Sequence, residues 1–365
     1  RGGVPDKQLH RWLDDGGAED VPSMVDGQRL LRVALRIMES GFAVQAVVSR
    51  EQHLRSEVCQ VLTAREWEAF EFDAGRVLAP EADQAVDADA ALHRELDLTT
   101  STRPVAGHRV RLEFDNAAAR KLLVRLIEGA RERLHWQCYI VDDDAISAEV
   151  VHALQAAAAR GVKVRFLVDA VYSLHEAFGQ KNILLSQLAT TPGVEVRAFR
   201  PVTFVPSVAA LKRRNHRKCL VIDGHTAVVT GRNLGAPYYR GFSEVRLSPL
   251  SSYREVPWLD CGAVFDGPLV SELERAFAHE WGRAGGDTQG VDPSPATGQL
   301  TARLVLHDGL RDTNTFDAQL ALIRHAEREL VIVNNFPLVV ELQRALVAAI
   351  ACGVRVRVLI GNVRP

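Results

Sequence analysis

The sequence lacks the features of membrane-spanning, secreted and strongly charged proteins. It has no uninterrupted apolar run of roughly eighteen residues, so no transmembrane helix is predicted. Its five cysteines form no close pair and no metal-ligand spacing, which predicts reduced thiols and a cytoplasmic protein. The 44 lysines and arginines are balanced by 46 aspartates and glutamates, so there is no overall basic field to attract nucleic acid.

The composition also excludes a disordered tail and a disulfide-stapled miniprotein. Hydrophobic residues make up 47% of the 365 positions and charged residues 25%, and this length suggests two domains or slightly more. An initiator methionine and a signal-like start are lacking. The chain begins at Arg1 and stops at Pro365 directly after a strand pattern, so we expect a fragment or a trimmed protein. Residues 1–103 are predicted to be a helical accessory region without recognisable chemistry.

From Val110 onward the pattern alternates between strands and helices. Val110 to Phe114 alternate as a strand, Asp115 can cap a following helix, and Gly161 stops an alanine-rich helix. A further strand follows at residues 162–168. This β-α-β-α-β order predicts an α/β domain with a mostly parallel sheet flanked by helices.

The same order of elements recurs downstream, which indicates an internal duplication. Gly161 matches Gly353 at an offset of 192, whereas Leu134 matches Leu330 at an offset of 196, so the second copy is four residues shorter. Its first strand is expected at residues 304–306. The alternative is chance similarity between two generic βαβ units. The predicted organisation is a helical region 1–103, a first domain 104–285, a Gly/Pro/Ser-rich linker 286–299 and the start of a second domain 300–365.

One short segment carries residues suited to chemistry on a phosphodiester. His216 and Lys218 are two residues apart, so both side chains leave the same face of a predicted strand. Asp223-Gly224 predicts a hairpin turn, and the returning strand ends at Gly231 and Asn233, which can reach the same rim. The imidazole can attack phosphorus, while the ammonium and amide groups stabilise charge on the non-bridging oxygens. Neither a metal nor a cofactor is expected.

This spacing resembles the HKD motif of the phospholipase D superfamily. His216-x-Lys218-x4-Asp223-x6-Thr230-Gly231-x-Asn233 is similar to the motif of bacterial cardiolipin synthases and related phosphatidyltransferases. Thr230 stands where those relatives usually carry glycine. The resemblance extends from about Val110 to Trp281. It implies duplicated phospholipase D-like α/β-sandwich domains.

The resemblance also implies roles for individual residues. His216 would be the nucleophile, or the acid/base of the reaction, and Lys218 and Asn233, with Gly231, would hold the phosphate. Asp223 would be motif scaffolding that supports the catalytic hairpin. Asp260 matches the carboxylate that accepts a hydrogen bond from the catalytic imidazole in relatives, although an aspartate before a strand is also a common turn residue. Tyr139 is expected to be a packed strand-end aromatic rather than a substrate contact.

The family needs two such motifs, whereas this sequence contains one His-x-Lys. The step of 55 residues from Gly161 to His216, applied to Gly353, places a second histidine at about 408 if the repeat holds. A second motif in missing C-terminal residues, a motif from another subunit, and a degenerate second half remain the alternatives.

The function implied by the resemblance is phospholipid phosphodiester transfer or hydrolysis through a phosphatidyl-histidine intermediate, as in a cardiolipin synthase. The substrate would be phosphatidylglycerol-like, the acceptor an alcohol or water, and the location cytoplasmic with peripheral contact to the inner membrane. Three alternatives stay open: an antibacterial lipase effector, a nuclease of the same superfamily, and a degenerate non-catalytic lipid-binding member.

Overall fold

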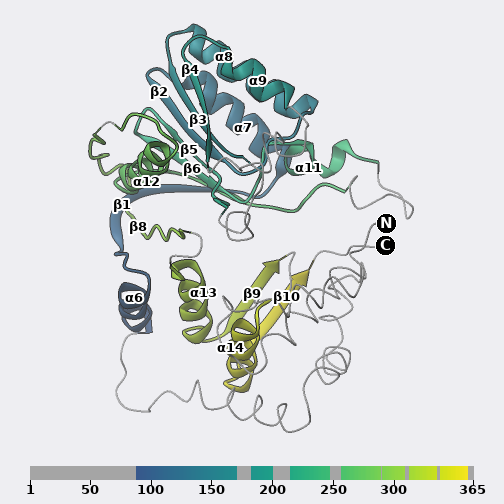
Figure 1. Cartoon of the computed structure of the whole chain (residues 1–365). Coiled ribbons are helices and arrows are strands. Elements are labelled where there is room, and N and C mark those ends of the chain that lie inside the picture. Colours follow the sequence, from purple (N-terminus) through teal and green to yellow (C-terminus); the bar gives the residue numbers. More distant parts are fainter. Residues whose placement is uncertain are drawn as a thin grey trace, which may run out of the picture. The chain divides into compact units, whose positions relative to one another are not determined.

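The computed structural model describes residues 88–170, 182–199, 214–246, 256–288, 290–308, 312–334 and 338–360 (Figure 1). Most of the predicted helical accessory region lies outside these residues, and its described end forms helix α6, Ala88–Thr99. The chain divides into two compact units, one of Asp97–Thr315 and one of Arg1–Leu96 with Phe316–Pro365. In the described part of the chain, no helix is both long and apolar enough to cross a membrane.

The larger unit is built on one eight-stranded sheet with the strand order β4-β3-β2-β5-β6-β7-β1-β8. In that order the strands are Val194–Phe199, Lys163–Asp169, Arg133–Cys138, Cys219–Ile222, Thr226–Thr230, Gly262–Asp266, Val105–Glu113 and Leu300–Ala302.

Helices cover both faces of this sheet. Helices α7 (Asn116–Gly129), α8 (Ala145–Ala159) and α9 (Ile183–Ala189) lie on one face, and α12 (Leu269–Arg283) lies on the other (Figure 1). All four residues of β5 are buried, because the strand packs against helices on both sides. This double burial explains why its sequence is a continuous apolar run instead of an alternating one.

Local signals in the sequence set the bounds of the helices. The Asp115 side chain accepts a hydrogen bond of 2.7 Å from the backbone N–H of Ala118, which confirms the predicted cap of α7. Gly161 follows the end of α8 with a φ of +95°, a conformation that favours glycine. The α/β class is confirmed, and α7 begins and α8 ends at the residues that the sequence predicted.

The sheet is mixed, which corrects the expectation of a mostly parallel one. Of its seven strand pairings, only β2 with β3 and β3 with β4 are parallel, and the other five are antiparallel. The parallel part is the portion connected by helical crossovers, which the sequence pattern revealed. The β5–β6 hairpin reverses the chain, and β7, β1 and β8 extend the sheet beyond it by antiparallel pairings between segments distant in sequence.

The second copy of the repeat reproduces the order of the first. Helix α13 (Asn314–Arg324), strand β9 (Glu329–Asn334), helix α14 (Val340–Ala351) and strand β10 (Arg355–Ile360) follow one another. β9 and β10 pair in parallel with Leu330 opposite Val356, as Leu134 lies opposite Val164 in β2 and β3. The shorter repeat is visible in α14, which has 12 residues where α8 has 15.

The expected first strand of the second copy is wrong in position. The strand that forms there is β8, which ends at Ala302 and pairs with β1 of the larger unit. Leu304 and Leu306 follow as irregular chain and pack against the apolar cluster between α12 and the sheet. The alternation of Leu304 and Leu306 predicted a strand, whereas the structure shows both side chains partly buried against this cluster. The preceding stretch is also packed, since Thr297 and Gly298 donate backbone hydrogen bonds to the carbonyl of Gly107.

Candidate active site

The hairpin formed by β5 and β6 presents the His-x-Lys segment at one end and a tight turn at the other. Asp223 and Gly224 form the turn with φ values of 52° and 71°, and the N–H of His225 donates to the carbonyl of Ile222 at 3.0 Å. The predicted hairpin turn is confirmed, since left-handed conformations at both central residues are typical of Asp-Gly turns.

His216 and Lys218 lie together just before β5. Nζ of Lys218 is 3.3 Å from Nδ1 of His216 and donates a hydrogen bond of 2.8 Å to the His216 carbonyl. Lys218 is 4% exposed, whereas His216 remains accessible to solvent. The pair therefore offers a reachable imidazole backed by an ammonium group fixed inside the protein.

The environment changes the pKa values of both groups in ways that matter for reactivity. Burial of the ring, together with the charge of Lys218, lowers the pKa of His216 to about 4. Burial lowers the pKa of Lys218 to about 8, although the negative charge of Asp260 works in the opposite direction. At neutral pH the imidazole is therefore neutral and retains a lone pair, and the lysine is still mainly charged.

Tyr139 contacts both members of the pair. Its ring centroid lies 4.4 Å from that of His216, and Nζ of Lys218 lies 4.9 Å from the centroid of the same ring. The aromatic face can stabilise the ammonium ion by a cation–π interaction. Sequence reasoning treated Tyr139 as a packing residue at the end of a strand, and the structure places its ring against both His216 and Lys218.

Gly231 and Asn233 follow β6 at the end of the hairpin that carries Lys218, since the N–H of Thr230 donates to the Lys218 carbonyl at 3.1 Å. Asn233 is 3% exposed, and its Oδ1 accepts a hydrogen bond of 3.1 Å from the N–H of Ile140. Gly231 donates its N–H to the carbonyl of Cys261 at 3.1 Å, and a side chain there would collide with the carboxylate of Asp260. The close approach of Asp260 gives a physical reason for glycine at position 231.

Asp260 is half-buried beside the hairpin. Its Oδ1 accepts a hydrogen bond of 2.7 Å from the N–H of Cys261. Burial raises the pKa of Asp260, while that bond and the positive charges of Arg232 and Lys218 act in the other direction. Its negative charge favours the charged form of Lys218 and so acts to raise the pKa of that lysine.

Asp223 lies at the opposite end of β5 from the His216–Lys218 pair. Its carboxylate accepts three backbone hydrogen bonds of 2.8 to 2.9 Å, from the N–H groups of Arg131, Glu132 and Arg133. These bonds fasten the hairpin turn to the start of β2. Since β5 separates Asp223 from the pair, its contacts are those of a scaffold.

Arg232 is a buried residue of the site that the sequence analysis did not single out. It is 2% exposed and donates to the carbonyls of Glu113 at 3.3 Å and Asp260 at 2.6 Å, and to Oδ1 of Asn116 at 3.2 Å. Its position between two motif residues, Gly231 and Asn233, could have marked Arg232 as a site residue. A charged side chain that is buried there needs polar partners. Arg232 fixes the end of the hairpin to β1 and to the residues before β7.

The segment that carries His216 is anchored on both sides. The buried carboxylate of Asp169, at the end of β3, lies 3.5 Å from Nη1 of Arg214 and accepts from the N–H of Asn215 at 3.4 Å. Arg217, whose neighbours are His216 and Lys218, donates to the carbonyl of His307 at 2.7 Å. These contacts limit the freedom of a segment without regular secondary structure.

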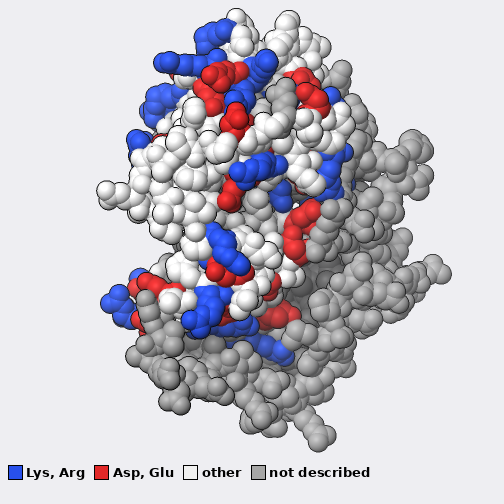
Figure 2. Space-filling view, turned by 90° about the vertical axis from the view of Figure 1, so that its left-hand side faces the viewer, with Lys and Arg blue, Asp and Glu red and all other residues white. Residues whose placement is uncertain are grey.

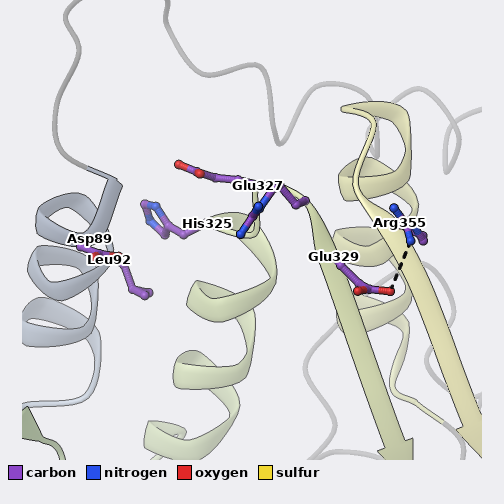
Figure 3. A pocket seen from close by; sticks show the side chains of 7 residues that line it. Asp89, Leu92, His325, Glu327, Glu329 and Arg355 are labelled. Atoms are coloured by element: carbon purple, nitrogen blue, oxygen red, sulfur yellow. Dashed lines mark ion pairs between the residues drawn. The ribbon is translucent and has the colours of Figure 1, made fainter. Parts of the chain in front are cut away.

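A separate hollow of about 560 Å³ lies in the other unit (Figure 3). Its charged lining is of mixed sign and includes an ion pair of 4.0 Å between Glu329 and Arg355. His325 at its edge is 2.8 Å from a carboxylate oxygen of Glu95. The hollow contains none of the predicted site residues. Across the described ranges, no group of three or more His, Cys, Asp or Glu is placed to hold a metal ion.

Comparisons with known proteins agree on the kind of domain. A family model described as "Cardiolipin synthase, PLD-like domain" matches residues 123–248. Cardiolipin synthase A of Pseudomonas aeruginosa is 31% identical over 182 residues, which cover 50% of this chain and 34% of that protein. Cardiolipin synthase C of Escherichia coli is 34% identical over 165 residues, which cover 43% of this chain and 32% of that protein.

A solved structure of phosphatidylserine synthase from Haemophilus influenzae matches with a TM-score of 0.47 and 15% identity, covering 73% of this chain and 65% of that one. The chain spans about a third of the length of the two cardiolipin synthases named above. The family match includes the complete hairpin from His216 to Asn233. Since that hairpin carries the predicted motif, the expected resemblance to the phospholipase D superfamily, near the bacterial cardiolipin synthases, is confirmed for the domain that contains residues 123–248.

Proposed function

We propose that this protein is a phosphatidyltransferase of the cardiolipin synthase type, with His216 as its nucleophile. The observation that carries the proposal is the pairing of a neutral, accessible imidazole with the buried ammonium of Lys218 at 3.3 Å. A nucleophile for phosphorus must hold a free lone pair, and the lowered pKa of His216 supplies it at neutral pH.

The first step transfers a phosphatidyl group to His216. The imidazole nitrogen forms a bond to phosphorus, and the bond from phosphorus to the leaving alcohol oxygen breaks. Lys218 and the amide of Asn233 stabilise the charge that develops on the non-bridging oxygens. The leaving oxygen takes a proton from an acid, because an alkoxide is a poor leaving group.

The second step regenerates the enzyme. The hydroxyl oxygen of an acceptor attacks phosphorus, gives its proton to the group that served as acid, and the N–P bond breaks. A second phosphatidylglycerol as acceptor yields cardiolipin, whereas water yields phosphatidic acid. We propose that the acid is a second imidazole, contributed by another His-x-Lys motif of the same polypeptide or of another subunit.

The balance of 44 lysines and arginines against 46 aspartates and glutamates favours a small anionic headgroup over a long polyanion as substrate. On the face shown in Figure 2, positive and negative side chains of the described residues are interspersed. Nucleic acid binding typically uses a continuous basic track, because neutralisation of many phosphates supplies the affinity. The proposed location is the membrane surface, where the lipid substrate lies.

The proposal is tested by incubating the protein with phosphatidylglycerol vesicles and identifying the products. Cardiolipin and glycerol are expected in equal amounts from the wild type, and neither from His216→Ala. Phosphatidic acid with free glycerol would retain the phosphatidyl-histidine chemistry but replace transfer by hydrolysis. Unchanged turnover in a folded His216→Ala protein would contradict the proposal.

A further inference from the structure

We infer that Phe114, Phe242 and Leu259 form a membrane-docking rim beside the active site, and that this rim seats the protein on an anionic lipid surface. The inference rests on the proposed function and specifies its partner. The three side chains are 62%, 45% and 57% exposed, respectively. Large apolar residues exposed to this degree and gathered next to a site are typical of interaction surfaces.

A buried polar pair holds the three rim residues in one neighbourhood. Arg232 donates to the carbonyl of Glu113, the residue directly before Phe114. It also donates to the carbonyl of Asp260, the residue directly after Leu259. Asn116 accepts from Arg232, and its Nδ2 donates to the carbonyl of Trp258 at 2.8 Å. Leu259 therefore lies between two residues whose carbonyls this pair fixes.

Phe242 is connected to the same polar pair. Nδ2 of Asn116 also donates to the carbonyl of Arg240 at 3.2 Å, and Phe242 begins the short helical turn η2 (Phe242–Glu244) two residues later. Asn116 is 2% exposed, so its amide is fully committed to the protein interior. The rim is thus positioned by rigid buried hydrogen bonds, although the rim side chains are exposed.

The same polar pair connects the rim to the catalytic hairpin. Arg232 lies between Gly231 and Asn233, and the carbonyl that it binds at 2.6 Å belongs to Asp260. Insertion of the rim into a bilayer would therefore bring the lipid surface to a fixed position relative to His216 and Lys218. This arrangement suits a substrate whose reacting phosphate lies at the interface.

The charges around the rim favour an anionic lipid surface. The exposed cations Lys121, Arg240 and Arg246 lie on the elements that carry or flank the rim. Two nearby carboxylates form ion pairs, Glu113 with Arg111 at 3.1 Å and Glu244 with Arg120 at 2.8 Å. The two that directly follow rim residues, Asp115 and Asp260, each accept a hydrogen bond of 2.7 Å from a backbone N–H. Exposed lysine and arginine next to inserted apolar side chains are the combination that anionic bilayers attract.

The test compares vesicle binding of two double variants in a His216→Ala background, which prevents lipid turnover during the measurement. One carries Phe114→Asp with Phe242→Asp. The matched control carries Leu98→Asp with Ile183→Asp, which changes two apolar residues that are 77% and 57% exposed elsewhere in the larger unit. Co-sedimentation is measured with vesicles of phosphatidylglycerol and phosphatidylethanolamine, and with phosphatidylcholine vesicles.

The rim variant is expected to bind anionic vesicles about tenfold or more weakly than the parent, whereas the control binds as the parent does. Equal binding by the rim variant and the parent would overturn the inference, as would equal binding of the parent to anionic and phosphatidylcholine vesicles. Loss of binding in the control as well would also overturn it, because the effect would not be specific to the rim.

A second measurement separates this inference from the proposed function. Both double variants, with His216 restored, are assayed on a water-soluble nitrophenyl phosphodiester. A wild-type rate of the rim variant on this substrate, together with its loss of vesicle binding, supports the rim as a docking surface, and the control variant is expected to keep both activities. If the wild type turns over the soluble diester but does not bind vesicles, the rim fails and the function stands. If the wild type binds vesicles through the rim but neither it nor the variants turn over any diester, the proposed function fails and the rim stands.

Discussion

His216 and Lys218 must hold opposite protonation states for the proposed chemistry. The pKa of His216 is lowered to about 4 and that of Lys218 to about 8, so a neutral imidazole and a charged ammonium coexist between these values. The rate of formation of the covalent intermediate is therefore expected to fall below about pH 4 and above about pH 8. A stopped-flow pH profile with a nitrophenyl diester measures both limbs. A rate that rises steadily through pH 8 would contradict the role of charged Lys218.

Tyr139 is expected to act as a positioning residue for this pair. Its ring lies 4.9 Å from Nζ of Lys218, and a cation–π contact of about 1 kcal/mol stabilises the charged form. Tyr139→Leu keeps apolar packing but removes the ring face, so the alkaline limb should move down by about one pH unit. Tyr139→Phe keeps the ring and should leave the limb in place. A limb that stays unchanged in the leucine variant would indicate that Tyr139 only packs.

Sequence reasoning found the motif residues of the candidate site but did not assign a role to two of their neighbours, Tyr139 and Arg232. The spacing from His216 to Asn233 could be read directly, because a strand places alternate side chains on one face. Tyr139 and Arg232 could not be assigned in this way, since their importance comes from neighbours distant in sequence. Tyr139 meets His216 across 77 positions, and Arg232 meets Asn116 across 116.

At the scale of elements, the hairpin depends on the bonds of Asp223. Its carboxylate accepts three backbone N–H groups at the start of β2, and a hydrogen bond to a charged group contributes about 1.5–3 kcal/mol. Asp223→Ala is expected to lower the free energy of unfolding by about 3 kcal/mol, since water replaces part of the interaction. Urea unfolding measures the loss.

The same variant distinguishes a scaffold from a catalytic group. At a temperature where Asp223→Ala is folded, as circular dichroism shows, the covalent intermediate should still form on His216. Loss of that chemistry without loss of stability would show that Asp223 takes part in the reaction.

Helix α12 is fastened to the sheet by Glu274. Its Oε1 lies 2.9 Å from Nε of Arg133 and 3.1 Å from Nδ1 of His135. Burial disfavours the charged form, but the interactions with His135 and Arg133 outweigh it and hold the pKa of Glu274 at about 2. A pKa below the ordinary value of 4.5 contributes stability that is complete above pH 4.5 and disappears as the pH falls through 2.

Glu274→Gln removes this pH-dependent contribution. The stability difference between wild type and variant is expected to shrink by about 3 kcal/mol between pH 7 and pH 2. Denaturant unfolding at the two pH values measures it. A difference that is independent of pH would show that the carboxylate charge does not hold α12.

For the whole molecule, local signals predicted the class and the repeat but not the second half of the sheet. Alternation and capping identified the crossover units from β2 to β3 and from β9 to β10, because their helices and strands are contiguous in sequence. The antiparallel half joins β7 to β6 and β1, and such pairings leave no local pattern. Leu304 and Leu306 show the same limit, since their alternation could not reveal that a distant apolar cluster buries them.

The central claim concerns the single His-x-Lys segment of the sequence: we propose that His216 forms a covalent bond to phosphorus. The most direct measurement uses a nitrophenyl phosphodiester, whose leaving group departs without an acid and therefore needs only the nucleophile. After a quench in base, which preserves phosphohistidine, mass spectrometry of peptides locates the adduct. The account predicts an adduct on His216 in the wild type and none in His216→Ala. An adduct on another residue, or turnover by His216→Ala at the wild-type rate, would contradict it.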